Sequence, residues 1–322
     1  MVRPVAASLV AGLSLYLLLP SLMGVFSSWR SLSELRWYWA FAALIAECAS
    51  FASLWRLDRI ALKTNARLAV ACAQLTGNAV GRVVPGGGAT AAASTVEMLK
   101  RAGFDTGRAT AALGASTALQ LGTTLALPLV ALPAILGGAP APRGLVEAAY
   151  LGALVLLVLV VFGVVAFSTN RPLGALGRAA QWLLNATVRR QRPVQGLPEK
   201  LLGERDFIRS TVGERWAAAL LAAAANTGFD YTALLLLLLA VGAQPRPSLV
   251  LLAYAAGELL ALVPLTPGGL GFVEAGLVGT LTLAGVHPQD AVVATLAYRV
   301  LSFWLPIPAG GVAYVVFRRR YG

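Results

Sequence analysis

The chain has 322 residues, of which 58% are hydrophobic and 12% are charged, and its formal net charge is +12. A soluble globular domain carries about 25% charged residues, so this composition excludes a soluble fold. In a soluble chain the positive charge would indicate a nucleic-acid partner. In a membrane protein it indicates basic loops on the cytoplasmic side, so we expect no nucleic-acid partner.

Six apolar runs exceed the roughly 18 residues that mark a membrane-spanning helix. They are Val5 to Phe26, Trp37 to Trp55, Ala109 to Leu136, Leu145 to Phe167, Trp216 to Val241 and Ala291 to Phe317. These runs predict an all-α polytopic membrane protein with about six full spans, in which residues 1–322 form a single membrane domain. The first run lacks a clear cleavage site, so we expect an uncleaved helix and not a signal peptide.

Basic clusters between the runs predict the topology. They lie at Arg56–Arg67, Lys100–Arg108, Asn170–Arg215 and Arg318–Arg320, and the positive-inside rule places all of them in the cytoplasm. We therefore expect a multi-pass protein of the cytoplasmic (inner) membrane with both termini cytoplasmic. The segment from Asn170 to Arg215 is either a solvated loop that sets the topology or, in its middle, an interfacial amphipathic helix.

An internal repeat relates the two halves of the chain. Pro85-Gly86-Gly87 recurs as Pro267-Gly268-Gly269, and Ala102-Gly103 recurs as Ala284-Gly285, at an offset of 182 residues. The same offset carries Trp37–Trp55 onto Leu220–Leu237 and Ala109–Leu136 onto Ala291–Arg318. The predicted repeats are residues 36–137 and 218–319, joined over residues 138–217 by a linking span and the basic cytoplasmic loop.

Each repeat is predicted as a helix, a Pro-Gly-broken re-entrant hairpin and a second helix. Length alone does not distinguish a re-entrant hairpin from a spanning one, because either returns to its starting side. Basic flanks place both ends of residues 68–97 in the cytoplasm, whereas residues 249–285 begin and end outside. The two repeats therefore have inverted topology, which is typical of secondary transporters.

The hairpin breaks are candidate binding elements. They consist of Pro85, Gly86, Gly87 and Gly88 in the first repeat and Pro267, Gly268, Gly269 and Gly271 in the second. Lipid cannot satisfy the backbone groups that such breaks free, so they must be buried or line a wet cavity. Helices that start after Gly88 and Gly271 would direct N-terminal N–H groups at an anion. Alternatively, the glycines only allow close helix packing.

Ionisable groups within the predicted spans are the other candidates, because charge inside a membrane is costly. The basic ones are Arg82 and Arg299, which follows Tyr298; the acidic ones are Glu274, Glu258, Glu47 and Asp230. Glu47 falls one residue from equivalence with Asp230 at the offset of 182. The arginines either form structural ion pairs with these acids or clamp a phosphate. Glu274 would serve gating or pairing, and the other acids would gate or relay protons.

Other sequence features limit the chemistry. His287 is the single histidine, which excludes histidine metal sites and Ser-His triads. Cys48 and Cys72 lie in apolar surroundings and indicate no metal site. There is no ATP-binding Walker motif and no nucleophile elbow. We therefore expect neither catalysis nor a cofactor.

The motifs resemble a known family. Arg82-Val-Val-Pro-Gly-Gly-Gly, Leu265-Thr-Pro-Gly-Gly-Leu-Gly-Phe-Val-Glu274 and Leu296-Ala-Tyr-Arg299 are similar to the lysylphosphatidylglycerol synthase membrane region. The resemblance covers nearly the whole chain and implies lipid translocation in a bacterial or archaeal inner membrane. The chain ends at Gly322 without an aminoacyl-transfer domain, so we do not expect it to make the lipid. Gln120 stands where family members often carry an acid.

These observations predict a flippase or transporter that moves an anionic phospholipid or lipid-linked headgroup by alternating access around the paired breaks. The membrane lipid would be its partner. Two alternatives stay open. One is an integral-membrane enzyme on lipid-linked substrates such as polyprenyl phosphates, and the other is an accessory subunit that docks through the basic loop.

Overall fold

The computed structural model describes residues 36–84, 87–136, 169–187, 195–199, 215–261 and 269–322, with single residues in the gap from 137 to 214. Four helices of this part are long and apolar enough to cross a membrane, namely Trp37–Ala61, Thr106–Ala131, Trp216–Ala240 and Pro288–Tyr321. The chain is thus a multi-pass, all-helical membrane protein. The predicted span Val5–Phe26 lies outside the described residues, as does nearly all of Leu145–Phe167.

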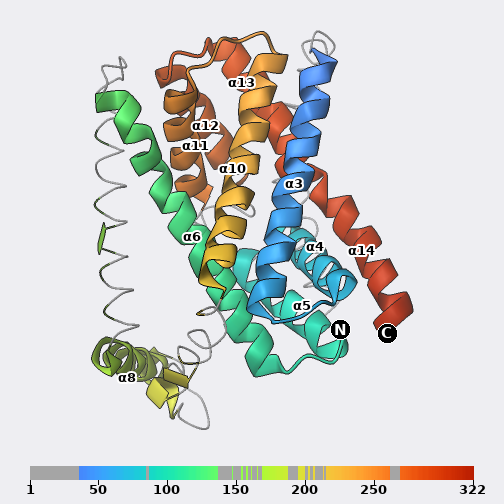
Figure 1. Cartoon of the computed structure of the whole chain (residues 1–322), viewed down its shortest axis with the longest axis vertical. Coiled ribbons are helices and arrows are strands. Elements are labelled where there is room, and N and C mark those ends of the chain that lie inside the picture. The colour runs from blue at the N-terminus through green and yellow to red at the C-terminus, as the bar shows by residue number, and fades with distance from the viewer. Residues whose placement is uncertain are drawn as a thin grey trace.

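Helices α3 (Trp37–Ala61) and α10 (Trp216–Ala240) form the central antiparallel pair (Figure 1). The Arg36 N–H donates to the Ala240 carbonyl at 2.9 Å, which ties the start of α3 to the end of α10. Small residues line their contact, including the fully buried Ala43 and Ala223, because small side chains let helix backbones approach closely in a membrane.

The ends of α3 and α10 correct the predicted register between these two helices. Lys63 and Gly242 both adopt positive φ, at 49° and 88°. The surrounding backbone hydrogen bonds match at an offset of 179: Thr64 N–H donates to Arg59 O, and Ala243 N–H donates to Leu238 O. The near-equivalence of Glu47 and Asp230, expected from an offset of 182, is therefore wrong, because the segment from the end of α10 to Gly285 is three residues longer than the segment from the end of α3 to Gly103.

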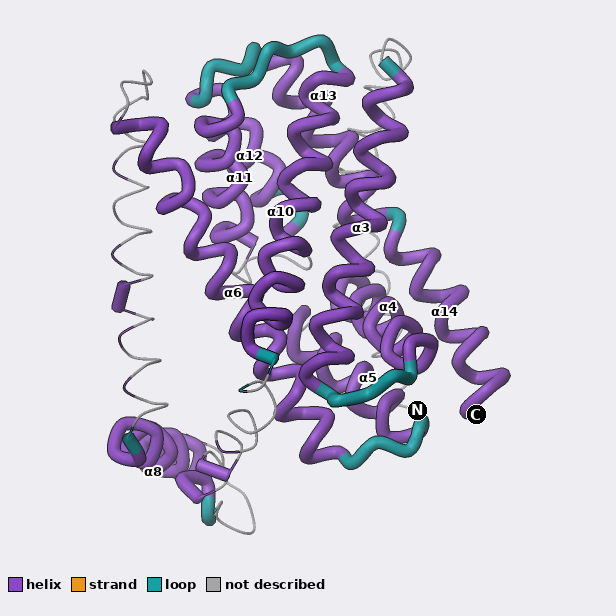
Figure 2. Tube along the Cα trace, viewed as in Figure 1, coloured by secondary structure: helices purple, strands orange, loops and turns teal. Residues whose placement is uncertain are grey.

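Two helical hairpins lie towards opposite ends of the bundle (Figure 2). One consists of α4 (Arg67–Val83) and α5 (Gly87–Arg101), and the other of α11 (Pro247–Ala261) and α12 (Phe272–Leu283). Their arms have 17, 15, 15 and 12 residues. Each arm is shorter than the roughly 20 residues that cross a bilayer as a helix.

The turn after each hairpin is the same structure. Gly103 and Gly285 have φ of 90° and 89°. Phe104 N–H donates to Leu99 O and Val286 N–H donates to Leu281 O, each at 3.0 Å, in Schellman motifs that need a left-handed residue. The next helices, α6 (Thr106–Leu136) and α13 (Pro288–Arg299), begin 182 residues apart. The predicted offset therefore holds from these turns onward.

The last predicted span is not one regular helix. A π-helical turn, η2 (Val300–Trp304), follows α13 and precedes α14 (Pro306–Tyr321). Leu305 N–H donates to Val300 O at 2.9 Å, five residues back. Pro306 lacks the N–H that would bond the carbonyl of Ser302, which favours a local change of helical winding.

The final helix of each half packs on the hairpin of the other half: α6 contacts α11, and α14 contacts α4. Gly310 of α14 allows this approach, because a Cβ there would lie 2.6 Å from the Leu75 carbonyl. The amphipathic helix left open for the basic segment is present as α8 (Asn170–Thr187), which lies beside the bundle at the α4–α5 end (Figure 1).

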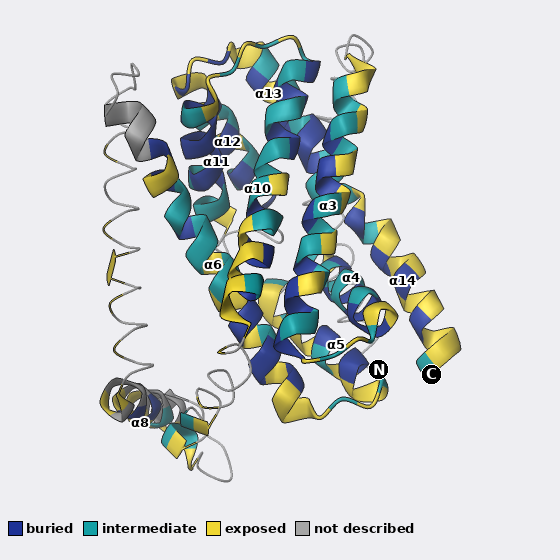
Figure 3. Ribbon diagram, viewed as in Figure 1, coloured by how far each residue is buried: buried dark blue, intermediate teal, exposed yellow. Residues whose placement is uncertain are grey.

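Burial divides the bundle into two main apolar clusters (Figure 3). The larger one packs α10, α11, α12 and α13 around Leu234, Leu238 and Leu281, all of them fully buried. The smaller one packs α4, α5 and α14 around Leu99 and Phe317. The outer faces carry exposed apolar side chains, as expected for helices in lipid; they include Trp37, Phe41, Val130, Leu221 and Val312.

Candidate functional site

The start of α12 and the end of α4 meet at the π turn of the last helix. Arg82, in the last turn of α4, donates from Nη1 to the Phe303 carbonyl at 2.5 Å. Its Cζ lies 5.1 Å from the centre of the Phe303 ring, and the Cζ of Arg299 lies 4.4 Å from the same ring. One buried aromatic ring thus receives two guanidinium groups, which the electron-rich face of the ring attracts.

Arg299 forms an ion pair with Glu274. Its Nε lies 2.7 Å from Oε1 of Glu274, and the two side chains are only 10% and 13% exposed. Glu274 also lies in the first turn of α12, where the positive end of the helix dipole stabilises an acid. The ion-pair hypothesis therefore holds for this pair. Arg82, in contrast, has no carboxylate at ion-pair distance among the described residues.

The remaining predicted acids gather on the α3–α10–α11 side of these arginines. Asp230 accepts hydrogen bonds from the hydroxyls of Tyr254 at 2.5 Å and Tyr298 at 2.8 Å. Glu47 and Glu258 both interact electrostatically with Asp230 and with Arg82. Oε2 of Glu47 is buried without a hydrogen-bond partner in the described part of the chain. The three acids thus form one electrostatically connected group with the arginines.

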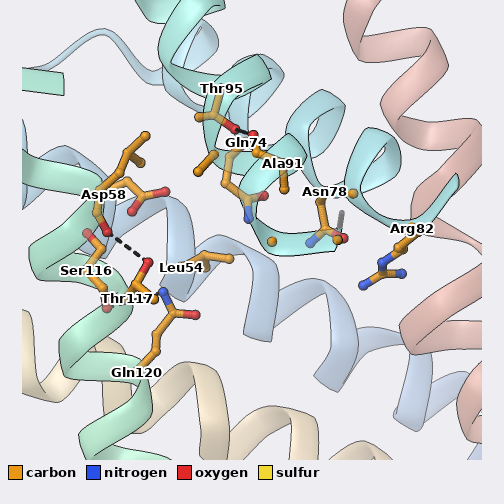
Figure 4. Close-up of a pocket in the computed structure, with 15 residues that line it drawn as sticks. Leu54, Asp58, Gln74, Asn78, Arg82, Ala91, Thr95, Ser116, Thr117 and Gln120 are labelled. Carbon is orange, nitrogen blue, oxygen red and sulfur yellow. Dashed lines mark hydrogen bonds between the residues drawn. The ribbon is translucent and has the colours of Figure 1, made fainter. Parts of the chain in front are cut away.

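A cavity of about 400 Å³ adjoins Arg82 (Figure 4). Its polar lining comes from four helices: Asp58 of α3, Gln74, Asn78 and Arg82 of α4, Thr95 of α5, and Ser116, Thr117 and Gln120 of α6. Gly87 and Gly88 line it at the hairpin tip beside Arg82. The cavity therefore extends from the tip towards the basic ends of α3 and α5, with the guanidinium at its inner end.

The structure separates two roles of glycine in the first hairpin. A Cβ on Gly81 would lie 2.7 Å from the Ala91 Cβ, and a Cβ on Gly77 would overlap Thr95, so these two permit close packing of α4 on α5. Gly87 has φ of 46°, and neither it nor Gly88 has any atom within 4 Å of an added Cβ. Close packing therefore does not explain Gly87 or Gly88, which border the cavity.

The second hairpin tip also contains glycines with positive φ. Gly269 and Gly271 have φ of 69° and 79° directly before α12, which begins at Phe272. In the first hairpin, the second helix was expected to start after Gly88, whereas α5 begins at Gly87. Pro85, Gly86, Pro267 and Gly268 lie outside the described residues. The structure thus brings together Arg82, Glu274, Tyr298 and Arg299 around the π turn and places Gly87 and Gly88 on the cavity.

Sequence reasoning missed Phe303 and most of the cavity lining. Gln74, Asn78 and Arg82 follow one another at intervals of four, so they share one face of α4, and this signal was available in the sequence. Asp58 was assigned to a cytoplasmic loop, but α3 continues to Ala61 and leaves this residue only 2% exposed. Nothing in the sequence marks Phe303, because one phenylalanine in an apolar span resembles a lipid-facing side chain.

Comparison with known proteins gives a consistent result. A UPF0104 membrane protein of Pyrococcus horikoshii is 29% identical over 129 residues, which are 38% of this chain and 38% of that protein. A UPF0104 membrane protein of Methanothermobacter thermautotrophicus is 31% identical over 91 residues, 28% of this chain and 26% of the relative. The matched segments thus span well under half the length of these curated relatives.

The family described as the lysylphosphatidylglycerol synthase TM region matches residues 5–310. This match includes both hairpins, the π turn and every residue of the site described above. With the two hairpin tips, Arg82 and the Glu274–Arg299 pair in place, the chain belongs to the lysylphosphatidylglycerol synthase TM-region family.

Proposed function

We propose that the protein moves an anionic phospholipid or a lipid-linked anionic headgroup across the cytoplasmic membrane. The observation that carries this proposal is the position of Arg82. Its guanidinium borders a polar cavity, held by a carbonyl and an aromatic ring, and no carboxylate of the described residues lies at ion-pair distance from it. A guanidinium can fork onto two phosphate oxygens, which makes it suitable for a phosphate headgroup.

The cavity suits a headgroup and not a whole lipid. Its volume of about 400 Å³ falls at the lower end of the range for small-ligand sites. Amide and hydroxyl groups such as those of Asn78, Thr117 and Gln120 line it. Such groups can hydrogen-bond a polar headgroup, while its acyl chains remain in the bilayer.

We infer an inverted-repeat architecture with re-entrant hairpins. Three observations support it: the antiparallel α3–α10 pair, the identical turns at Gly103 and Gly285, and hairpin arms too short to span. In such folds, breaks that meet near the membrane midplane mark the substrate site. The basic ends of α3, α5 and α14 then face the cytoplasm, and both termini lie there.

We assign the structure to a cytoplasm-facing state of the proposed cycle. The Arg82 cavity lies on the side of α4 and α5, whereas the packed apolar cluster of α10 to α13 and the Glu274–Arg299 pair lie on the other side. In the opposite state, Arg299 would exchange Glu274 for the substrate phosphate. Binding and release of the headgroup, with no bond broken in the lipid, is then the entire reaction.

The proposal is tested with the purified protein in proteoliposomes that contain fluorescent phosphatidylglycerol or fluorescent phosphatidylcholine. Dithionite added outside quenches labelled lipid as it reaches the outer leaflet. We expect the unaltered protein to exchange phosphatidylglycerol faster than phosphatidylcholine. In Arg82→Gln, the rate of phosphatidylglycerol exchange should fall about 10- to 100-fold, because a hydrogen bond to a charged group contributes about 1.5–3 kcal/mol.

Arg101→Gln is the matched control, because Arg101 lies on the next helix and is more than half exposed, so this variant should exchange lipid normally. Equal exchange by Arg82→Gln and the unaltered protein would contradict the proposal. Mass spectrometry of the recovered lipid should show it unchanged, and consumption of a lipid-linked donor would instead indicate an enzyme. No exchange by the unaltered protein would favour an accessory role.

A further inference from the structure

A second cavity, separate from the one at Arg82, lies where α3 ends and where α4 and α10 begin. It has a volume of about 680 Å³, and four of its nine lining residues are arginines. They come from three helices: Arg56 and Arg59 from the last turns of α3, Arg67 from the start of α4 and Arg215 from the position before α10. The two cavities share no lining residue.

The positive charge in this cleft is not neutralised by the described residues. None of the nine lining residues is acidic. Among the described residues, Asp58 stands between Arg56 and Arg59 in the sequence, but it is 2% exposed and lines the other cavity. Both α4 and α10 begin here without an acid in the first turn and without a side-chain cap, so the positive ends of their dipoles add to the field.

Arg59 provides an independent sign of a missing partner. Its Nε atom is buried and finds no hydrogen-bond acceptor among the described residues. A buried donor of a charged group that lacks an acceptor is costly, and such sites usually bind an ion or a water. An anion bound in the cavity would supply such an acceptor.

The positive-inside rule alone does not explain this arrangement. That rule requires basic residues on a cytoplasmic segment, and solvated side chains spread along a loop would satisfy it. Here three helices converge so that four arginines line one cavity. Trp216, the first residue of α10, is 61% exposed beside the cleft, and exposed tryptophans favour the level of the lipid headgroups.

We propose that this arginine cleft, formed by Arg56, Arg59, Arg67 and Arg215, binds a phosphate-bearing anion at the cytoplasmic surface. Basic pockets between membrane helices on this side accommodate phosphorylated headgroups. The same chemistry would accept the phosphodiester of an inner-leaflet lipid or a free phosphate compound. The proposal concerns resident binding and does not rest on lipid movement through the Arg82 cavity.

The test measures binding to the purified protein by native mass spectrometry. Phosphatidylglycerol, phosphatidylcholine and inorganic phosphate are each titrated against the unaltered protein and against Arg59→Gln/Arg67→Gln. We expect the double variant to bind phosphatidylglycerol about tenfold more weakly or worse, because two guanidinium contacts to phosphate are lost. Phosphatidylcholine binding should be weak in both proteins.

The matched control is Arg319→Gln/Arg320→Gln, which removes the same charge from exposed positions in the last turn of α14. It should bind phosphatidylglycerol as the unaltered protein does. Arg67→Gln alone changes an exposed side chain at the rim and should reduce binding without affecting folding. Arg82→Gln should leave binding at the cleft unchanged. Failure of the cleft proposal is therefore distinguishable from failure of the transport proposal.

The outcomes separate the sources of the phosphate. Preferential loss of phosphatidylglycerol binding assigns the cleft to lipid. Saturable binding of inorganic phosphate that disappears in the double variant, without lipid preference, assigns it to a soluble phosphate compound. The proposal would be overturned if the cleft variants bound phosphatidylglycerol and inorganic phosphate as well as the unaltered protein does.

Discussion

At the scale of single residues, Phe303 organises the charges at the centre of the molecule. Arg82 and Arg299 repel one another, and each is attracted to the Phe303 ring. The ring is 4% exposed, so water does not screen these contacts. Because Arg82 also bonds the backbone carbonyl of the same residue, side chain and main chain of Phe303 both hold the tip of the first hairpin.

This arrangement predicts energetic coupling between Phe303 and Arg82. In a double-mutant cycle of Phe303→Leu and Arg82→Gln, we expect a coupling of about 0.5–2 kcal/mol in the free energy of unfolding. The carbonyl is present in every variant, so the cycle isolates the ring. The measurement is denaturant unfolding in mixed micelles.

The control cycle pairs Phe317→Leu with Arg82→Gln. Phe317 is equally buried, at 2% exposure, but packs on Tyr321 and not on an arginine. Its coupling should be close to zero. A coupling for Phe303 no larger than this control would show that the ring only fills space.

At the scale of elements, the first hairpin combines a tightly packed stem with an open tip. Gly77 and Gly81 lie four residues apart on α4 and bring α5 into contact, while Gly87 and Gly88 leave space beside the cavity. The hairpin can therefore be rigid along its length and still present free backbone groups at its end. This division is what a binding element within a membrane requires.

Substitution by alanine should separate these two functions. Gly81→Ala should lower the free energy of unfolding by about 1–3 kcal/mol, since its Cβ would meet both Ala91 and the Gly87 carbonyl. Gly88→Ala, the matched control, should change it by less than about 1 kcal/mol. Thermal unfolding of the two purified variants tests this. Equal destabilisation would mean that the tip is packed as tightly as the stem.

The sequence predicts the elements better than the contacts between them. The offset of 182 located both hairpins and the turns at Gly103 and Gly285, because proline and glycine mark backbone conformations directly. The same offset does not relate α3 to α10, because alanine-rich helices contain few residues that mark the register. The π turn and the role of Phe303 depend on packing against two arginines that are distant in sequence, so local patterns do not reveal them.

At the scale of the whole molecule, the two halves depend on each other. The last helix of each half packs on the hairpin of the other half. Both hairpins also contribute a charged residue to the centre, Arg82 from one and Glu274 from the other. In the proposed cycle, a change of state would therefore alter contacts between the two halves.

The side on which the cavity opens is measurable by labelling. With Cys48 and Cys72 replaced, Thr117→Cys places a thiol in the cavity and should react with an impermeant maleimide only from the cytoplasmic side of membrane vesicles. Gln244→Cys, in the exposed turn between α10 and α11, should react only from the other side. Labelling of both thiols from the same side would contradict the proposed topology.

The π turn between α13 and α14 affects the balance between the two states of the proposed cycle. In a molecule with identical halves, exchanging their conformations would leave the energy unchanged and populate both states equally. Here α6 is α-helical over all 31 residues, whereas its counterpart is interrupted at Val300–Trp304. A difference of about 1.4 kcal/mol between the states shifts the populations tenfold. In the proposed cycle, the two states would therefore differ in population, and the π turn before Pro306 is one source of this difference.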